Sequence, residues 1–115
     1  MDNLKEILEK AKSAFGAKDY QTAFEIWKSL AEQRNAEAQF NLGRMYSYGR
    51  GVKENHKKAI KWYQLAGEQG NAEAQINLDL LLKETENTET QNNLDLLLEK
   101  KDFWKRVKGI FGQSN

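Results

Sequence analysis

Asn-Ala-Glu-Ala-Gln stands at Asn35–Gln39 and returns residue for residue at Asn71–Gln75, which gives the chain an internal period of 36 residues. The same offset continues upstream without a gap and aligns Trp27 with Tyr63. An internal period in the range of about 20–50 residues is the signature of stacked supersecondary units. The sequence therefore predicts a repeat protein, and stacks of this kind usually present an extended surface to a partner.

The most complete unit, residues 35–70, reads as two helices joined by a glycine turn. Asn35 is suited to cap the first helix, and Asn55 the second. The turn is predicted at Tyr48-Gly49-Arg50-Gly51, because two glycines allow positive φ angles. Apolar residues at helical spacing predict the buried faces of the two helices: Ala38, Leu42, Met45 and Tyr46 in the first, and Ala59, Trp62, Tyr63 and Ala66 in the second.

These residues resemble the Sel-1-like repeat, a helical repeat related to the tetratricopeptide repeat. The resemblance rests on Ala-Glu-Ala-Gln-x-x-Leu-Gly-x-x-Tyr, then Gly-x-Gly-Val, Ala-x-x-Trp-Tyr and a terminal glycine at Gly70. It covers one whole unit and, more loosely, residues 19–82. It implies an all-α protein, a right-handed α/α solenoid of stacked antiparallel helix pairs. It also implies an adaptor or scaffold for other proteins, with no catalytic residues and no cofactor.

The flanking units depart from the pattern. Residues 1–34 lack the Ala-Glu-Ala-Gln motif but predict a first helix over about residues 3–16. Residues 71–115 keep the spacing while losing consensus residues, with Asp79 where the complete unit has Gly43. Terminal repeats are often atypical because one side faces water. We therefore expect a single domain, 1–115, of about six helices in three pairs, the outer two pairs acting as degenerate caps.

A shorter duplication lies inside the third unit. Gln75-Ile-Asn-Leu-Asp-Leu-Leu-Leu is nearly repeated from Gln91, 16 residues later. On one straight helix this offset would put the two leucine clusters on nearly opposite sides. A break over the polar stretch Glu84–Thr90 would instead let them face each other as an antiparallel pair. A long exposed helix used for dimerisation is the competing interpretation, so the sequence leaves monomer and dimer open.

Composition excludes several classes of protein. The chain has 115 residues with no cysteine, so it holds no disulfide framework and no thiolate metal site. Its mean hydropathy is −0.85, and no stretch predicts a signal peptide or a membrane span, which favours a cytoplasmic protein. His56, the single histidine, has neither an orienting carboxylate nor a nucleophile indicated by spacing, and we interpret it as a surface residue. No metal site and no enzyme are expected.

The net charge of +1 conceals segregated charge. The net charge is zero over residues 1–34, +3 over 35–70, −6 over 71–99 and +4 over 100–115. A nucleic-acid binder more often shows one continuous basic face, so no nucleic-acid partner is expected. The same segregation suits a small inhibitor or immunity-type protein that matches one specific target.

Candidate partner-binding residues lie on the first helices, away from the predicted buried stripe. First helices of stacked pairs tend to line the concave side, where Asn41, Arg44 and Tyr48 fall on one face. The candidates one repeat later are Asn77 and Leu80. A ladder of Asn41 and Asn77 would hydrogen-bond an extended peptide, with Arg44 supplying charge. The leading functional prediction is therefore a non-enzymatic module that binds a protein or peptide partner on its concave face.

The C-terminal run Lys100–Gly112 predicts a basic amphipathic helix. Such a helix either lies on an anionic membrane or docks in a partner's groove. The alternative is that it buries its aromatic side chains against the open end of the stack, as a cap. The residues that carry this prediction are Phe103, Trp104, Lys105, Arg106, Val107, Lys108, Ile110 and Phe111.

Overall fold

The structure, a computed structural model, describes residues 3–86. The chain divides into two units, Met1–Leu81 and Leu82–Asn115, and the fold described below belongs to the first. The described residues contain five helices and no strand. Their bounds are α1 Leu4–Gly16, α2 Tyr20–Glu32, α3 Ala36–Tyr48, α4 His56–Glu68, and a fifth helix over residues 72–86.

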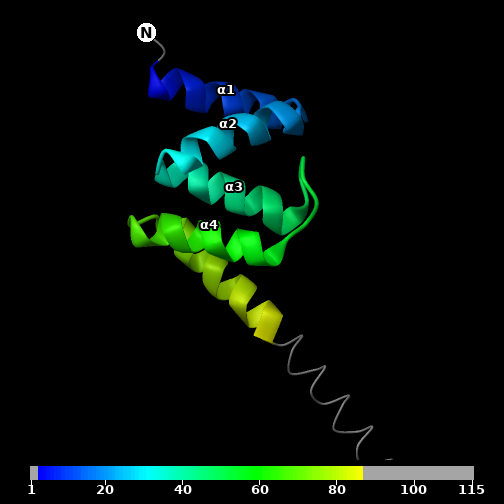
Figure 1. Ribbon diagram of the computed structural model, residues 1–115, viewed down its shortest axis with the longest axis vertical. Helices are drawn as coiled ribbons and strands as arrows, with labels where there is room; N and C mark the ends of the chain where they lie inside the picture. Colours follow the sequence, from blue (N-terminus) through cyan, green and yellow to red (C-terminus); the bar gives the residue numbers. More distant parts are fainter. Residues whose placement is uncertain (1–2, 87–115) are drawn as a thin grey trace, which may run out of the picture. The chain divides into compact units, whose positions relative to one another are not determined.

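Within the first unit the helices stack in the order of the sequence. α1 packs on α2, α2 on α3 and α3 on α4, and each chain reversal makes neighbouring helices antiparallel (Figure 1). This is the all-α solenoid that the repeat predicts, and α1 confirms the helix expected over residues 3–16. The expected sixth helix and the closing of the third repeat lie outside the described residues.

Every described helix starts at an asparagine or aspartate. The side-chain oxygen of each cap accepts a hydrogen bond from a backbone N–H in the first turn, which satisfies one of the donors that a helix start leaves unpaired. Asn35 and Asn55 are caps, as the sequence predicts. The full set of caps is Asn3, Asp19, Asn35, Asn55 and Asn71.

Asn35 belongs to two helices at once. Its side-chain oxygen accepts from the Ala38 N–H at 2.8 Å and so starts α3. Its own backbone N–H donates to the Leu30 carbonyl at 3.0 Å and so closes α2. Asn71 makes both kinds of bond one repeat later, between α4 and the fifth helix. The first residue of the repeated pentapeptide therefore connects the end of one helix to the start of the next.

The last residue of the pentapeptide also joins helices. Gln39 is 3% exposed, and its Nε2 donates to the Ala31 carbonyl at 3.2 Å. Its Oε1 accepts from Gln69 Nε2 at 2.8 Å. Gln75 repeats the first of these bonds by donating to the Gly67 carbonyl at 3.2 Å. A buried amide such as that of Gln39 must find partners, and both glutamines bond the start of one helix to the end of the one before.

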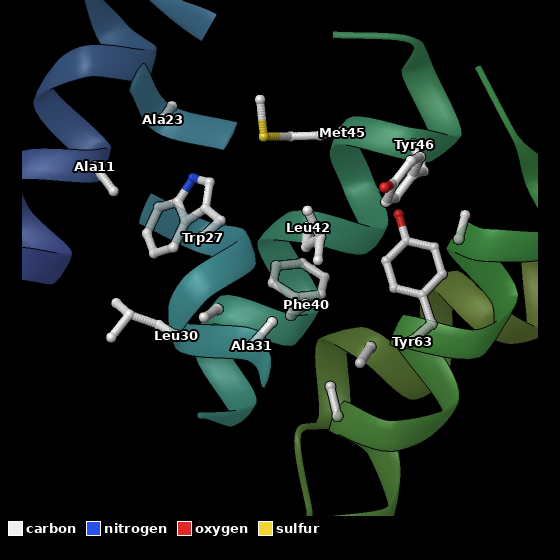
Figure 2. Close-up of a cluster of buried hydrophobic side chains, with 14 of the residues drawn as sticks. Ala11, Ala23, Trp27, Leu30, Ala31, Phe40, Leu42, Met45, Tyr46 and Tyr63 are labelled. Atoms are coloured by element: carbon white, nitrogen blue, oxygen red, sulfur yellow. The ribbon is translucent and has the colours of Figure 1, made fainter. Parts of the chain in front are cut away.

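The core between the repeats is built from the stripes that the sequence predicts (Figure 2). On α3 all four predicted residues are buried, with Leu42 at 0% exposure. On α4, Tyr63 is 1% exposed, whereas Trp62 is only half-buried. The Tyr63 ring lies so close to Gly43 that a Cβ there would approach it to 2.7 Å. Glycine at position 43 therefore lets α3 and α4 cross closely.

The two helix pairs differ in the connection inside each pair. A short turn, residues 17–19, joins α1 to α2, whereas a longer loop, residues 49–55, joins α3 to α4. In Figure 1 this loop extends from the end of α3 toward α2. Gly51, with φ of +75°, lies so close to Tyr20 that a Cβ would approach its carbonyl oxygen to 2.8 Å. The predicted glycine turn is confirmed, and it packs on the start of α2.

Candidate functional site

A groove with a volume of about 830 Å³ lies along the first helices of the repeats. Its walls come from α1, α3 and the start of the fifth helix, and Trp27 of α2 contributes to its lining. Three of the predicted partner-binding residues, Asn41, Arg44 and Tyr48, lie in this lining. Their role in binding a partner stays a prediction, while their common position on the groove is a feature of the fold.

The α3 side of the groove is a single helix face. Glu37, Asn41, Arg44 and Tyr48 line it at successive turns, from the first turn of α3 to its last residue. At a rise of about 1.5 Å per residue this face is about 16 Å long. An extended peptide rises about 3.3 Å per residue, so the face matches about five residues of such a chain.

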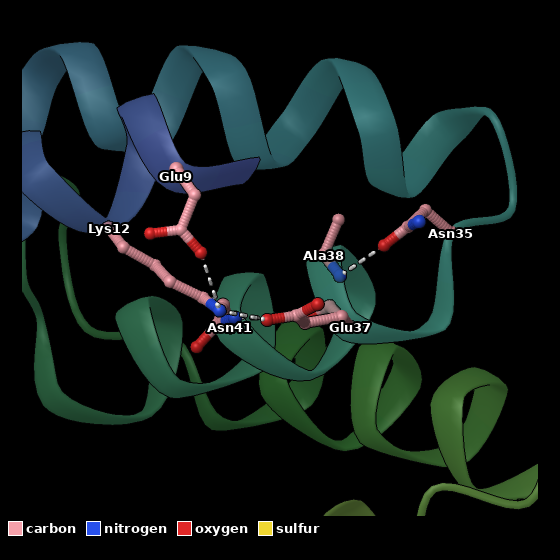
Figure 3. Close-up of polar contacts among 6 residues, drawn as sticks. All are labelled: Glu9, Lys12, Asn35, Glu37, Ala38 and Asn41. Carbon is pink, nitrogen blue, oxygen red and sulfur yellow. Dashed lines mark hydrogen bonds and ion pairs between the residues drawn. The ribbon is translucent and has the colours of Figure 1, made fainter. Parts of the chain in front are cut away.

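The Glu37 end of the groove is closed by charge pairing (Figure 3). Lys12 of α1 places its Nζ 2.9 Å from Glu37 Oε1 on α3 and 3.7 Å from Glu9 Oε1 on its own helix. The hydrogen bond and the negative charge of Glu37 raise the pKa of Lys12 above its ordinary value of 10.5. These contacts link α1 to α3 and pair the positive charge of Lys12.

Asn41 is engaged with its own helix. Its Nδ2 donates to the Glu37 carbonyl one turn earlier, at 3.0 Å. A bond of this type competes with outside partners for the amide donor. The side-chain oxygen of Asn41 remains as the group that an incoming peptide N–H can meet.

The other end of the groove holds two arginines positioned by aromatic rings. The Arg44 guanidinium lies over the Phe40 ring, 5.6 Å from its centroid. Arg50 lies over the Tyr20 ring at 5.7 Å, and its Nη1 donates to the Tyr20 hydroxyl at 2.9 Å. Beside them Tyr48 is 62% exposed. Sequence spacing singled out Arg44 and Tyr48 but missed Arg50, which only the packing of the loop on Tyr20 brings to the groove.

Asn77 and Leu80 are not among the residues that line this groove. Asn77 is half-buried and lies near the Tyr63 hydroxyl, as does Ser47. Burial raises the pKa of Tyr63 above 10.0, and these two contacts act in the opposite direction. Leu80 is 58% exposed. Asn41 lines the groove and Asn77 does not, so a ladder of the two stays a prediction.

His56 has a partner that the spacing did not indicate. Its Nε2 lies 2.9 Å from Glu54 Oε1, in the loop before α4, and 38% of its side chain is exposed. Glu54 lies 59% exposed, so the pair is at the surface, as predicted for His56. No cluster of metal-ligating side chains occurs among residues 3–86.

No helix in the described part of the chain is both long and apolar enough to cross a bilayer. The basic helix predicted at Lys100–Gly112 lies outside the described residues. Membrane contact or partner docking through that helix therefore stays a prediction.

Comparison with known proteins gives concordant results. The family model described as Sel1 repeat matches residues 12–35 and 36–71. A sel1-like repeat-containing protein of Acanthamoeba polyphaga mimivirus is 56% identical over 39 residues, which are 34% of this chain and 7% of that protein. The crystal structure of a Sel1 repeat protein from Oxalobacter formigenes superposes with a TM-score of 0.54 at 40% identity.

The match to that crystal structure covers 56% of this chain and 27% of the other. The chain thus spans a small part of both relatives, which are longer proteins. Sel1 repeats are generally non-enzymatic modules for protein–protein interaction. With two adjacent repeats matched and the helical stack in common, the chain belongs to the Sel1 repeat family.

Proposed function

We propose that this protein is a non-enzymatic adaptor that binds an extended segment of a partner protein in the groove along α1, α3 and the start of the fifth helix. The observation that carries the proposal is the groove itself, with a volume of about 830 Å³. A volume of that size is within the range of specific ligand sites, and the groove is long enough for a short stretch of chain.

The chemistry of the lining supports the same function. Tyr48 offers an exposed aromatic surface, Arg44 a guanidinium, and Asn41 a free amide oxygen. Tyrosine and arginine are the residue types enriched where partners bind, because they combine large contact area with directional polar groups. Protein interaction is also what the Sel1 repeat family generally does.

The test is site-specific crosslinking in the full chain. A photoreactive phenylalanine derivative replaces Tyr48 in the groove or Gln64 on the exposed side of α4. We expect a partner protein from the source lysate to crosslink at position 48 and not at position 64. The double variant Asn41→Ala, Arg44→Glu should lose the partner, with its melting temperature unchanged.

A matched control carries the same two kinds of change outside the groove, an amide replaced by alanine and a cation replaced by glutamate. Gln64→Ala combined with Lys28→Glu alters two exposed side chains on α4 and α2. This control should keep the partner. A partner that crosslinks only at position 64, or that survives the groove variant, would place the binding surface elsewhere and overturn the proposal.

A further inference from the structure

The charges along the groove are paired at one end only. Lys12 is met by the carboxylates of Glu37 and Glu9. Within the described part of the chain, Arg44 and Arg50 have no ion pair with any carboxylate. The groove therefore runs from an end where the cation is paired to an end with two cations that form no ion pair in the described residues.

The geometry of these two arginines suits an anionic ligand. Each guanidinium has one face over an aromatic ring, Phe40 for Arg44 and Tyr20 for Arg50. A guanidinium held against a ring loses less freedom when its remaining N–H groups bind a ligand, and its donor spacing fits a carboxylate in bidentate fashion. Arg50 is held further by its bond to the Tyr20 hydroxyl.

Apolar surface lies next to these cations. Tyr48, at the end of α3, is mostly exposed, and Phe15, at the end of α1, is half-buried at the groove wall. A ligand that reaches both arginines therefore also meets aromatic surface. A free carboxylate alone would leave this surface uncovered, whereas a peptide with an apolar side chain beside its carboxylate would cover it.

One carboxylate competes with such a ligand. Glu73, near the start of the fifth helix, lines the groove and makes no ion pair among the described residues. It occupies the repeat position of Glu37, which binds Lys12 one repeat earlier. Glu73 thus reduces the positive potential of the groove without cancelling both arginines.

We propose that the groove recognises an acidic peptide: an extended segment of about five residues whose carboxylate binds Arg44 and Arg50, with an apolar side chain on Tyr48 and Phe15. This proposal rests on the function proposed above and names the chemistry of the partner. The carboxylate belongs to an aspartate or glutamate side chain of that segment, and the free end of a chain is the competing source that the test separates.

Fluorescein-labelled hexapeptide pools test it against the full-length protein by anisotropy. All pools have a blocked N-terminus and two apolar positions randomised among Ala, Leu, Phe and Tyr. The first has two fixed glutamates and an amidated end, and the second has glutamines in their place. The third has lysines, and the fourth has glutamines with a free C-terminal carboxylate.

We expect the glutamate pool to bind about tenfold or more tightly than the glutamine amide pool, as the loss of a charge-assisted hydrogen bond requires. The lysine pool should bind most weakly. Tighter binding of the fourth pool than of the first would move the carboxylate to a chain end and overturn the side-chain assignment, whereas binding of the first alone would support it. Rising salt should weaken the favoured pool.

Three variants locate the contact. Arg44→Gln and Arg50→Gln should each weaken the favoured pool about tenfold, because each removes one charged donor. Glu73→Gln should tighten it severalfold. Lys28→Gln, which removes an equal charge from α2 outside the groove lining, should leave affinity unchanged. Far-ultraviolet circular dichroism of each variant confirms that the fold is intact.

Equal binding of the first pool and of the second, amidated glutamine pool would overturn the acidic-peptide proposal, and so would a preference for the lysine pool. It would also be overturned if no pool bound, or if Lys28→Gln lost affinity. The crosslinking experiment decides the adaptor function separately. A partner crosslinked at position 48, together with pools bound without regard to charge, would keep the groove as the binding surface while removing the acidic specificity.

Discussion

The two described helix pairs share matching positions along their first helices but differ in the contacts that the charged residues there make. Counted along each helix, Lys12 of α1 and Arg44 of α3 hold the same position, nine residues in. Lys12 binds Glu37 on the next first helix, but Arg44 lies over Phe40, and Glu73 is left without an ion pair in the described part of the chain. In the first repeat the cation at this position pairs with the next first helix. In the second repeat the cation forms no such pair within residues 3–86 and can bind a ligand.

The comparison shows that contacts between neighbouring helices and contacts with a partner compete for the same surface of a solenoid. Ion pairing between neighbouring first helices uses charged side chains that line the groove, as at Lys12 and Glu37. At Arg44 the cation instead stacks on a ring of its own helix, that of Phe40. The cores beneath are alike, with Trp27 and Tyr63 at matching repeat positions. The predictions below separate what the repeats share from what differs.

The largest expected effect is on the shared core. Trp27 and Tyr63 are 2% and 1% exposed. Trp27→Ala and Tyr63→Ala should each lower the free energy of unfolding by about 3–5 kcal/mol, because each leaves a large cavity. Urea unfolding followed by circular dichroism measures this. A cost near zero for one of them would mean that its repeat contributes little to the cooperative stack.

The second prediction concerns the two connections. Gly51→Ala should cost about 2–4 kcal/mol, because alanine disfavours positive φ and its Cβ would meet the Tyr20 carbonyl. The matched change Gly16→Ala, at the end of α1, meets nothing within 4 Å and should be neutral or slightly stabilising. Thermal unfolding compares them, and equal effects would contradict the packing of the longer loop on α2.

The third prediction compares the two glutamines of the repeated pentapeptide. Gln39 is buried with both amide groups bonded, whereas Gln75 is exposed. Gln39→Ala should cost about 1–3 kcal/mol, since it removes two hydrogen bonds, one of them buried. Gln75→Ala should cost less. Denaturant midpoints of the two variants give the order, and a reversed order would refute the bridging role assigned to Gln39.

The smallest effect is a difference in acid response between two helix caps. Asp19 and Asn55 begin α2 and α4 at matching positions. Hydrogen bonds from the Thr22 side chain and backbone lower the pKa of Asp19 below its ordinary 3.8. A lowered pKa stabilises the fold above pH 3.8, and this contribution is lost as the pH falls through the lowered value.

Asp19→Asn keeps the cap and removes the titration, which makes the first repeat resemble the second. Melting temperatures measured from pH 6 to pH 2 should therefore fall less steeply for this variant than for the unaltered protein. Parallel curves would show that Asp19 does not contribute to the acid response.

Much of this fold could be predicted because the deciding residues recur. Caps, apolar stripes and the glycine turn depend on residue type at fixed spacing, so Asn35, Leu42 and Gly51 were identifiable from the sequence. The candidate site was predicted only in part. Asn41, Arg44 and Tyr48 share one helix face, which helical periodicity predicts.

The rest depends on contacts between distant segments. The turn before α2 is shorter than the loop before α4. The 36-residue offset therefore does not align α1 with α3, and it does not pair Lys12 with Arg44. Arg50 reaches the groove only through Tyr20, and Asn77 lies near the Tyr63 hydroxyl and not in the groove lining. Periodicity carries no information about such contacts.

The double role of Asn35 and Asn71 has a consequence for how such arrays grow. Each asparagine closes the helix before it with its backbone and opens the helix after it with its side chain. A gene segment duplicated from one asparagine to the residue before the next would therefore supply both its own beginning and the terminator of its predecessor. Such an insertion requires no new linker.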